Sequence, residues 1–152
     1  MPCLNTNYFG SISFDPQAVI EFPRGLPGFD DRRRFVAVQF EDSRPLVFLQ
    51  SIEDPGLCFI TLPVLAIDAR YRLGMSSEDK ELVGLPVSRK IQIGADVMCL
   101  AVLSIRETGP TANLMAPVVI NLHNYKAVQA VDTESRYSHQ HVLVPEKAAL
   151  CS

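Results

Sequence analysis

The residues best suited to catalysis or metal binding in this sequence are three histidines, His123, His139 and His141. His139 and His141 are two residues apart, so both side chains would lie on one side of an extended segment. A zinc site needs further ligands, and a hydrolase needs a nucleophile and an orienting group. No cysteine or acid lies at ligand spacing around this pair. An enzyme is therefore the weaker hypothesis, and we predict no catalytic residue, no metal and no cofactor.

The paired carboxylates of Glu53 and Asp54 are a second possible acid–base site. They precede Pro55-Gly56, which predicts a turn, and no histidine or lysine is near them in sequence. A second charged turn is expected at residues 30–34, where three arginines follow two aspartates. We expect both turns to be solvated, with the arginines partly neutralised by the aspartates beside them.

The four cysteines are Cys3, Cys58, Cys99 and Cys151, and none belongs to a CxxC motif. Cys58 and Cys99 lie in apolar runs and are predicted to be buried thiols. The N-terminus has no basic-then-apolar leader, and no apolar run reaches membrane-spanning length. We therefore expect a cytoplasmic protein with reduced thiols and no membrane association.

The overall composition is that of one globular domain. The chain has 152 residues, 47% of them hydrophobic and 20% charged, which is enough to bury a core. Eleven prolines and eight glycines are spread along it, which favours many short strands over long helices. The net charge of -3 argues against direct binding of nucleic acid, which usually requires a basic surface.

Apolar patterns predict about ten short strands. Residues 8–14 alternate and are expected to form a hairpin with residues 19–22. Residues 46–51 are apolar on both faces until Gln50, which predicts a central strand. Residues 97–105 are rich in valine and isoleucine, so we predict a buried strand rather than a helix. The other strands are expected at residues 35–40, 57–62, 71–75, 90–93, 118–122, 126–131 and 142–144.

One helix is predicted at residues 76–83. Ser76 can cap its start, with Asp79 three residues later, and Gly84 and Pro86 end it. A single helical turn can also follow Pro63. Together these elements predict one all-β, mainly antiparallel domain over residues 1–152. We expect a small closed or partly open barrel with one or two short helices, its core at about residues 8–144 and a loose tail at 145–152.

Two stretches contain unusual combinations of turn residues and apolar residues. Residues 22–29 read Phe-Pro-Arg-Gly-Leu-Pro-Gly-Phe, which predicts a structured loop with Leu26 and Phe29 as apolar anchors. The loop could simply pack on the core, or its prolines could hold it open for binding. Residues 113–121 read Asn-Leu-Met-Ala-Pro-Val-Val-Ile-Asn and carry no charge. They predict a break at Pro117 followed by a strand, because proline cannot donate to a strand ladder.

The order of these blocks resembles the FliW family of bacterial flagellar assembly factors. The resemblance covers about residues 8–144, and the joint occurrence of the two long blocks in this order is specific. It also includes Leu49-Gln50-Ser51 before an acidic turn, residues 127–129, and Tyr137 followed by His141. The motif positions are Phe22, Pro23, Gly25, Pro27, Gly28, Gln50, Asn113, Leu114, Asn121 and Gln129.

The resemblance implies a non-enzymatic protein that binds the translational regulator CsrA and, separately, flagellin. It implies that CsrA is engaged away from its RNA groove, so that flagellin mRNA is no longer repressed. Free flagellin would then titrate the factor away and release CsrA. We expect a monomer when the protein is free, and an acidic face that suits a basic partner. The expected contacts are Leu26, Phe29, Asp30, Asp31, Glu53, Asp54, Met115, Ala116 and Pro117.

Two other hypotheses remain open from the sequence. The chain could be a small barrel that binds a ligand or RNA in its mouth. The motif residues could also be purely structural, with Asn113 and Asn121 only bonding backbone groups at strand ends.

Overall fold

The computed structural model describes residues 1–131 and 136–143, so the predicted tail at 145–152 and Cys151 lie outside the described residues. In the described part, the chain forms eleven short strands, two α-helices and two 3-10 turns. The strands are β1 (Cys3–Thr6), β2 (Gly10–Ser13), β3 (Ile20–Glu21), β4 (Arg34–Val38), β5 (Val47–Ser51), β6 (Cys58–Pro63), β7 (Val97–Arg106), β8 (Gly109–Ala112), β9 (Val118–Asn121), β10 (Ala127–Gln129) and β11 (His141–Val142). The helices are α1 (Val64–Ile67) and α2 (Ser77–Leu82), and the 3-10 turns are η1 (Pro16–Ala18) and η2 (Glu41–Ser43).

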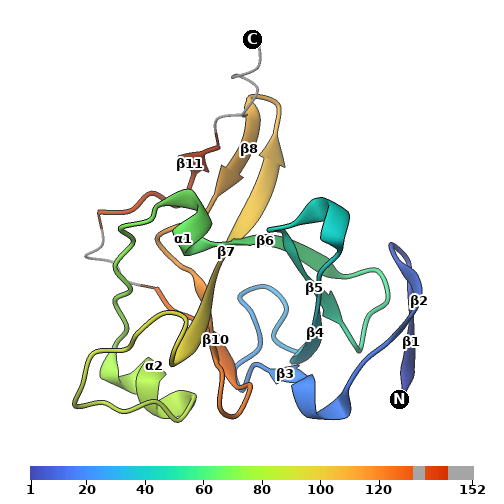
Figure 1. Cartoon of the computed structure of the whole chain (residues 1–152), viewed down its shortest axis with the longest axis horizontal. Coiled ribbons are helices and arrows are strands. Elements are labelled where there is room, and N and C mark those ends of the chain that lie inside the picture. The colour runs from blue at the N-terminus through green and yellow to red at the C-terminus, as the bar shows by residue number, and fades with distance from the viewer. Residues whose placement is uncertain (132–135, 144–152) are drawn as a thin grey trace.

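One strongly curved sheet forms the body of the molecule (Figure 1). Its strands follow the order β10-β9-β7-β6-β5-β4-β3, and β8 and β11 extend from the far end of β7. All ladders between these strands are antiparallel. The two ends of the sheet meet at a single bridge between Glu21 and Lys126, where the Glu21 N–H donates to the Tyr125 carbonyl at 2.9 Å. The fold is therefore a partly open antiparallel barrel, which confirms the predicted fold class.

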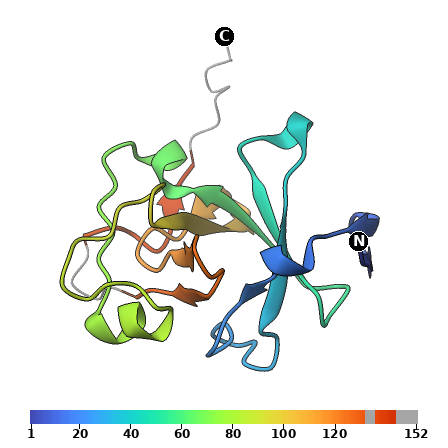
Figure 2. The ribbon, with the colours of Figure 1, turned by 60° about the horizontal axis from the view of Figure 1, so that its bottom comes forward.

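The sheet separates two hydrophobic cores, which we call the inner and the outer core. The inner core lies inside the curve of the sheet, where β3, β4, β5, β7, β9 and β10 each contribute at least one buried side chain. The outer core lies between the opposite face of β7, β9 and β10 and the segment that contains α1 and α2 (Figure 2). Because side chains alternate along a strand, Leu100 of β7 enters the inner core, and its neighbours Cys99 and Ala101 enter the outer core.

The helix α2 confirms the predicted capping. The Ser76 hydroxyl accepts a hydrogen bond from the Asp79 N–H at 3.0 Å, which satisfies one free donor of the first turn. Gly84 ends the helix with a φ of +78°, a left-handed conformation that favours glycine. The single turn predicted after Pro63 is also present, as α1.

The predicted hairpin between residues 8–14 and 19–22 is wrong. The first of these segments contains β2, which pairs with β1 instead, with Leu4 opposite Ile12. The second contains β3, which pairs with β4, with Ile20 opposite Phe35. The sequence pattern predicted the wrong strand partners because Asp15 caps the 3-10 turn η1 and does not belong to a hairpin turn. This 3-10 turn carries the chain away from β2.

The strands predicted at residues 71–75 and 90–93 are also wrong, because both segments cover the outer core as irregular chain. Tyr71 is buried, donates its hydroxyl to the Leu114 carbonyl at 2.6 Å and stacks on Tyr137. Ile91 is likewise buried, and Ile93 forms one isolated bridge with Val97. Alternating apolar residues here reflect packing on a core rather than pairing in a ladder.

The irregular segment before β7 is held by one ion pair. Arg89 donates to both oxygens of Asp96, at 2.9 and 3.0 Å, and the Gln92 N–H donates to Asp96 Oδ2 at 2.8 Å. These hydrogen bonds, the one from Arg89 first, lower the pKa of Asp96 to about 2 from its usual 3.8. The charged carboxylate therefore favours the folded state.

This pair predicts a loss of stability in acid. Because the pKa of Asp96 is lower in the folded state than in the unfolded chain, its contribution is complete above about pH 4. The contribution disappears as the pH falls through about 2. We expect the wild-type protein to lose more unfolding free energy between pH 4 and pH 2 than Asp96→Asn does, as measured by urea denaturation at each pH. Equal pH dependence of the two proteins would contradict this assignment.

Candidate partner-binding surface

The Pro/Gly loop at residues 22–29 is tightly ordered by its own backbone. The Gly25 N–H donates to the Phe22 carbonyl at 2.9 Å, and the Phe29 N–H donates to the Leu26 carbonyl at 2.7 Å. Phe22 and Leu26 are buried in the inner core. Phe29 is 38% exposed, and its ring packs edge-to-face with that of Phe59. The loop therefore has a buried base and an exposed aromatic side chain.

Gly25 allows this loop to fold back on itself. Its φ is +68°, and a Cβ placed there would lie 2.7 Å from the Cα and the carbonyl oxygen of Asp30. Gly28 also has a positive φ, of +86°, but a Cβ there would meet no atom within 4 Å. Gly25 is therefore required both for its backbone conformation and for space, whereas Gly28 is required for conformation alone.

The acidic turn at residues 53–54 lies against the charged tip at residues 30–34. Glu53 Oε1 accepts the N–H groups of Arg33 and Arg34 at 2.8 and 3.3 Å, and the Arg34 side chain donates to Glu53 Oε2 at 3.4 Å. Partial burial of Glu53 opposes its ionisation, but these three hydrogen bonds outweigh that effect and lower its pKa. Arg32 pairs with Asp31 and, at 3.5 Å, with Asp54. The structure thus brings together the two segments that the sequence separated by about twenty residues.

This surface is less acidic than the sequence alone indicates. Its four carboxylates are accompanied by Arg32, Arg33 and Arg34, so the net charge of the two turns is -1. Asp31, Glu53 and Asp54 are paired with these arginines. Asp30 is exposed, and no side-chain partner is found for its carboxylate among the described residues. Asp30 is therefore the carboxylate most available to a partner.

The Leu49-Gln50-Ser51 motif positions the acidic turn. The Ser51 hydroxyl accepts the N–H groups of Glu53 and Asp54, at 3.1 and 2.9 Å. The amide of Gln50, which is fully buried, donates to the carbonyls of Asp54 and Pro55 at 3.4 and 3.3 Å. A glutamine and a serine at the end of a buried strand therefore fix the backbone of the turn that carries the carboxylates.

The segment at residues 113–121 is held by its two asparagines. Asn113 Oδ1 accepts the N–H groups of Met115 and Ala116, at 3.1 and 3.0 Å. Asn121 donates to the Val83 carbonyl at 2.8 Å, which ties β9 to the end of α2. Pro117 stands just before β9, where its missing N–H costs no ladder bond, as predicted.

The two sequence blocks approach each other across Gln129. The Gln129 side chain donates to the Ala116 carbonyl at 3.0 Å, and Gln129 also lines a hollow next to the Pro/Gly loop. This hollow has a volume of about 250 Å³ and is lined by Arg24, Gly25, Pro27, Asp30, Val128 and Gln129. Segments about a hundred residues apart in sequence therefore contribute to one hollow. We call this hollow the motif surface, together with the neighbouring residues 29–34, 53–54 and 113–117.

The expected contact residues differ in how they lie on the motif surface. Phe29, Asp30, Asp31 and Glu53 are exposed, and Asp54 and Met115 are half-buried. The remaining three are buried: Leu26, Ala116 and Pro117.

Arg24 is a member of this surface that the sequence reasoning did not select. It donates to Glu78 Oε2 at 3.2 Å and to Asp79 Oδ1 at 3.3 Å, so it links the Pro/Gly loop to the first turn of α2. Its sequence signal was available, since it is the one charged residue in residues 22–29. Its partners could not be read from the sequence because they lie more than fifty residues away.

The histidines and cysteines lie apart from this surface in sequence and in their contacts. His123 and His139 are exposed, and His141 belongs to β11, opposite Ala112. Within residues 1–131 and 136–143, no group of three or more His, Cys, Asp or Glu side chains could hold a metal ion. Burial raises the pKa of Cys58 to about 11 and that of Cys99 to about 12, so both thiols are protonated at neutral pH.

Comparison with known proteins decides the family. A family model described as FliW protein matches residues 3–143. The chain belongs to the FliW family. It is 32% identical over 146 residues to the flagellar assembly factor FliW of Geobacillus sp. (strain WCH70), covering 95% of this chain and 96% of that protein. It is 31% identical over 147 residues to the FliW of Clostridium botulinum (strain Langeland / NCTC 10281 / Type F), covering 95% and 99%.

A solved structure supports the same conclusion. A crystal structure of the flagellar assembly factor FliW matches with a TM-score of 0.81 and 31% sequence identity, covering 96% of this chain and 99% of that one. The resemblance read from residues 22–29 and 113–121 is therefore confirmed, together with the FliW fold. The α-helices of the described part have four and six residues, which is too short to cross a membrane.

Proposed function

We propose that this chain is a cytoplasmic flagellar assembly factor that binds CsrA and, separately, flagellin. Binding to CsrA acts allosterically, away from the RNA groove, and allows flagellin mRNA to be translated. Free flagellin competes for the factor and releases CsrA, so flagellin synthesis follows flagellin level by mass action. The observation that supports this proposal most directly is that Gln129 links the two family blocks: its side chain donates to the Ala116 carbonyl, and it lines the hollow beside the Pro/Gly loop.

The motif surface offers a rigid binding face. The Pro/Gly loop and the acidic turn are both fixed by backbone hydrogen bonds, so little conformational entropy is lost when a partner binds. Phe29 provides an exposed aromatic side chain, the kind of residue that often dominates binding energy. Asp30 provides a charge that suits a basic RNA-binding protein. Leu26, Ala116 and Pro117 act indirectly, by holding these groups in place.

The proposal is tested by size-exclusion chromatography of the purified chain. We expect it to elute as a monomer alone, to co-elute with CsrA, and to co-elute separately with flagellin. We expect no shift of RNA in a gel without CsrA, because the chain carries a net charge of -3. Failure of both co-elutions would remove this function, and direct, salt-sensitive RNA binding would favour an RNA-binding barrel instead.

A charge reversal tests whether the motif surface is the binding face. We expect Asp30→Lys to weaken CsrA binding roughly tenfold, with a smaller effect at high salt, because a favourable pair becomes a repulsive one. Glu107→Lys is the matched control, since it makes the same charge change at the exposed turn between β7 and β8. Isothermal titration at two salt concentrations measures both variants. Equal weakening by the two changes would show that only net charge matters.

A further inference from the structure

The outer edge of β4 is open beyond its first pair with β3. The Arg34 carbonyl accepts the N–H of Ile52 at 2.9 Å, so Arg34 directs its backbone groups toward β5. Backbone direction alternates along an antiparallel ladder, and the groups of Ala37 therefore point to the opposite edge. At that edge, Ile20 of β3 pairs with Phe35. The turn η1, which precedes β3 in the chain, lies beyond this pair and carries the chain away from β4. No described strand pairs with Ala37 on this side.

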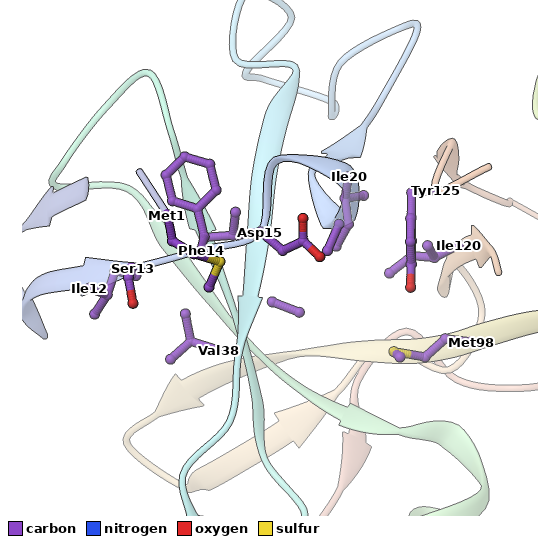
Figure 3. Close-up of a pocket in the computed structure, with 13 residues that line it drawn as sticks. Met1, Ile12, Ser13, Phe14, Asp15, Ile20, Val38, Met98, Ile120 and Tyr125 are labelled. Carbon is purple, nitrogen blue, oxygen red and sulfur yellow. The ribbon is translucent and has the colours of Figure 1, made fainter. Parts of the chain in front are cut away.

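This open edge lies in a groove of about 340 Å³, which is within the usual range of ligand pockets, about 300–1,000 Å³. Val36, Ala37 and Val38 line the groove along β4. Figure 3 shows Met1, Ile12, Phe14 and Val38 on one side of it and Ile20, Met98, Ile120 and Tyr125 on the other. The groove therefore has apolar walls on both faces of a free strand edge.

Such an edge is unusual because proteins generally protect free strand edges. Common devices are lysine or proline on the edge, a bulge, or cover by a loop. Residues 36–38 are Val-Ala-Val, and Ala37 is exposed. Of the described side chains that line the groove, that of Asp15 is the one that carries a charge, and Figure 3 shows it between the two apolar groups. An uncovered strand edge with apolar walls and one carboxylate side chain is complementary to an extended segment that carries apolar side chains and a cation.

We infer that the groove binds an extended peptide segment of a partner protein, which adds to β4 as a further strand at Ala37. Successive side chains of the segment enter the two opposite walls, and because both walls are apolar, apolar or β-branched side chains suit both sets of positions. A lysine or arginine of the segment meets the carboxylate of Asp15. Main-chain hydrogen bonds to Ala37, and to Gln39 two residues on, supply most of the affinity. This binding mode does not depend on the identity of the partners proposed above.

The test uses a defined peptide and no natural partner, so its failure is distinct from failure of the proposed function. The probe is an acetylated and amidated peptide, Lys-Val-Thr-Val-Thr-Val, titrated into 15N-labelled protein and followed by NMR. We expect saturable shifts and slowed exchange at the amides of Ala37 and Gln39. We expect a single N-methyl group to abolish binding when it is placed at every second peptide position and to be tolerated at the positions between, because alternate amides face β4. Loss of binding at all positions, or at none, would overturn the inference.

Two protein variants complete the test. Ala37→Pro removes the outward N–H and should abolish peptide binding, whereas Ala37→Ser keeps that N–H and should bind as the wild type does. Asp15→Asn keeps the oxygen that accepts the Gln17 N–H at 2.9 Å but removes the charge. This variant should bind the lysine peptide several-fold more weakly than the wild type does. It should bind a peptide with glutamate in place of that lysine no more weakly than the wild type does. Shifts at Ala37 on raising protein concentration without peptide would mean that a second copy occupies the edge, which would also overturn the inference.

Discussion

Replacing Leu114 with aspartate is expected to lower the free energy of unfolding by roughly 4–5 kcal/mol. Leu114 is 1% exposed in the outer core, so the new carboxylate would be buried without a cation. The backbone cannot move easily to expose it, because the Leu114 carbonyl accepts the Tyr71 hydroxyl and its N–H donates to the Ser138 carbonyl. Urea denaturation followed by circular dichroism measures the loss.

Pro117→Ala is the control in the same segment. Pro117 is also buried, but the backbone hydrogen bond that its carbonyl accepts from the Ala130 N–H at 2.9 Å is kept by alanine. The substitution removes little apolar area and releases some entropy of the unfolded chain, so we expect a loss of about 1 kcal/mol. Equal stability of the two variants would show that Leu114 does not contribute to the core as described.

Replacing Gly25 with alanine is expected to disrupt the Pro/Gly loop and to reduce partner binding more than tenfold. A left-handed conformation costs a non-glycine residue about 1–2 kcal/mol, and here the new Cβ would also collide with the Asp30 backbone. Relief of the collision must move residues 25–30, and with them Phe29 and Asp30. Binding is measured by titration with CsrA and with flagellin, and stability by urea denaturation.

Gly28→Ala separates the two causes. Gly28 has the same sign of φ but open space around its Cβ position, so only the conformational penalty applies. We expect a stability loss of about 1 kcal/mol and nearly unchanged binding. If Gly28→Ala weakened binding as much as Gly25→Ala, the collision with Asp30 would not be the reason for the glycine.

Elements whose sequence signals are local can be predicted from the sequence. Ser76 and Gly84 placed α2 because a capping hydroxyl and a left-handed stop act within a few residues. Pro117 placed the start of β9 because proline excludes itself from a ladder interior. Strand pairing is harder to predict. From the sequence, the strand of Ile20 could pair with residues 8–14 or with residues 34–38, and the choice depends on the turn η1 and on the curved sheet as a whole.

The binding surface could be predicted only in part. The motif blocks identified the family and two of the segments that approach each other. The burial of Leu26 and Ala116, and the neutralisation of Glu53 and Asp54 by the arginines, depend on contacts between distant segments. The ion pairs of Arg24 could not be predicted for the same reason, because the fold alone brings α2 beside the loop.

The strands β7 and β9 serve both cores, with alternate residues on each side. Neither half of the molecule can therefore melt while the other stays intact, since loosening one core withdraws a wall from the other. We expect a single cooperative thermal transition that is the same for every spectroscopic probe. Truncation to a smaller binding fragment should fail for the same reason, because any cut that removes β7 or β9 opens both interiors to water.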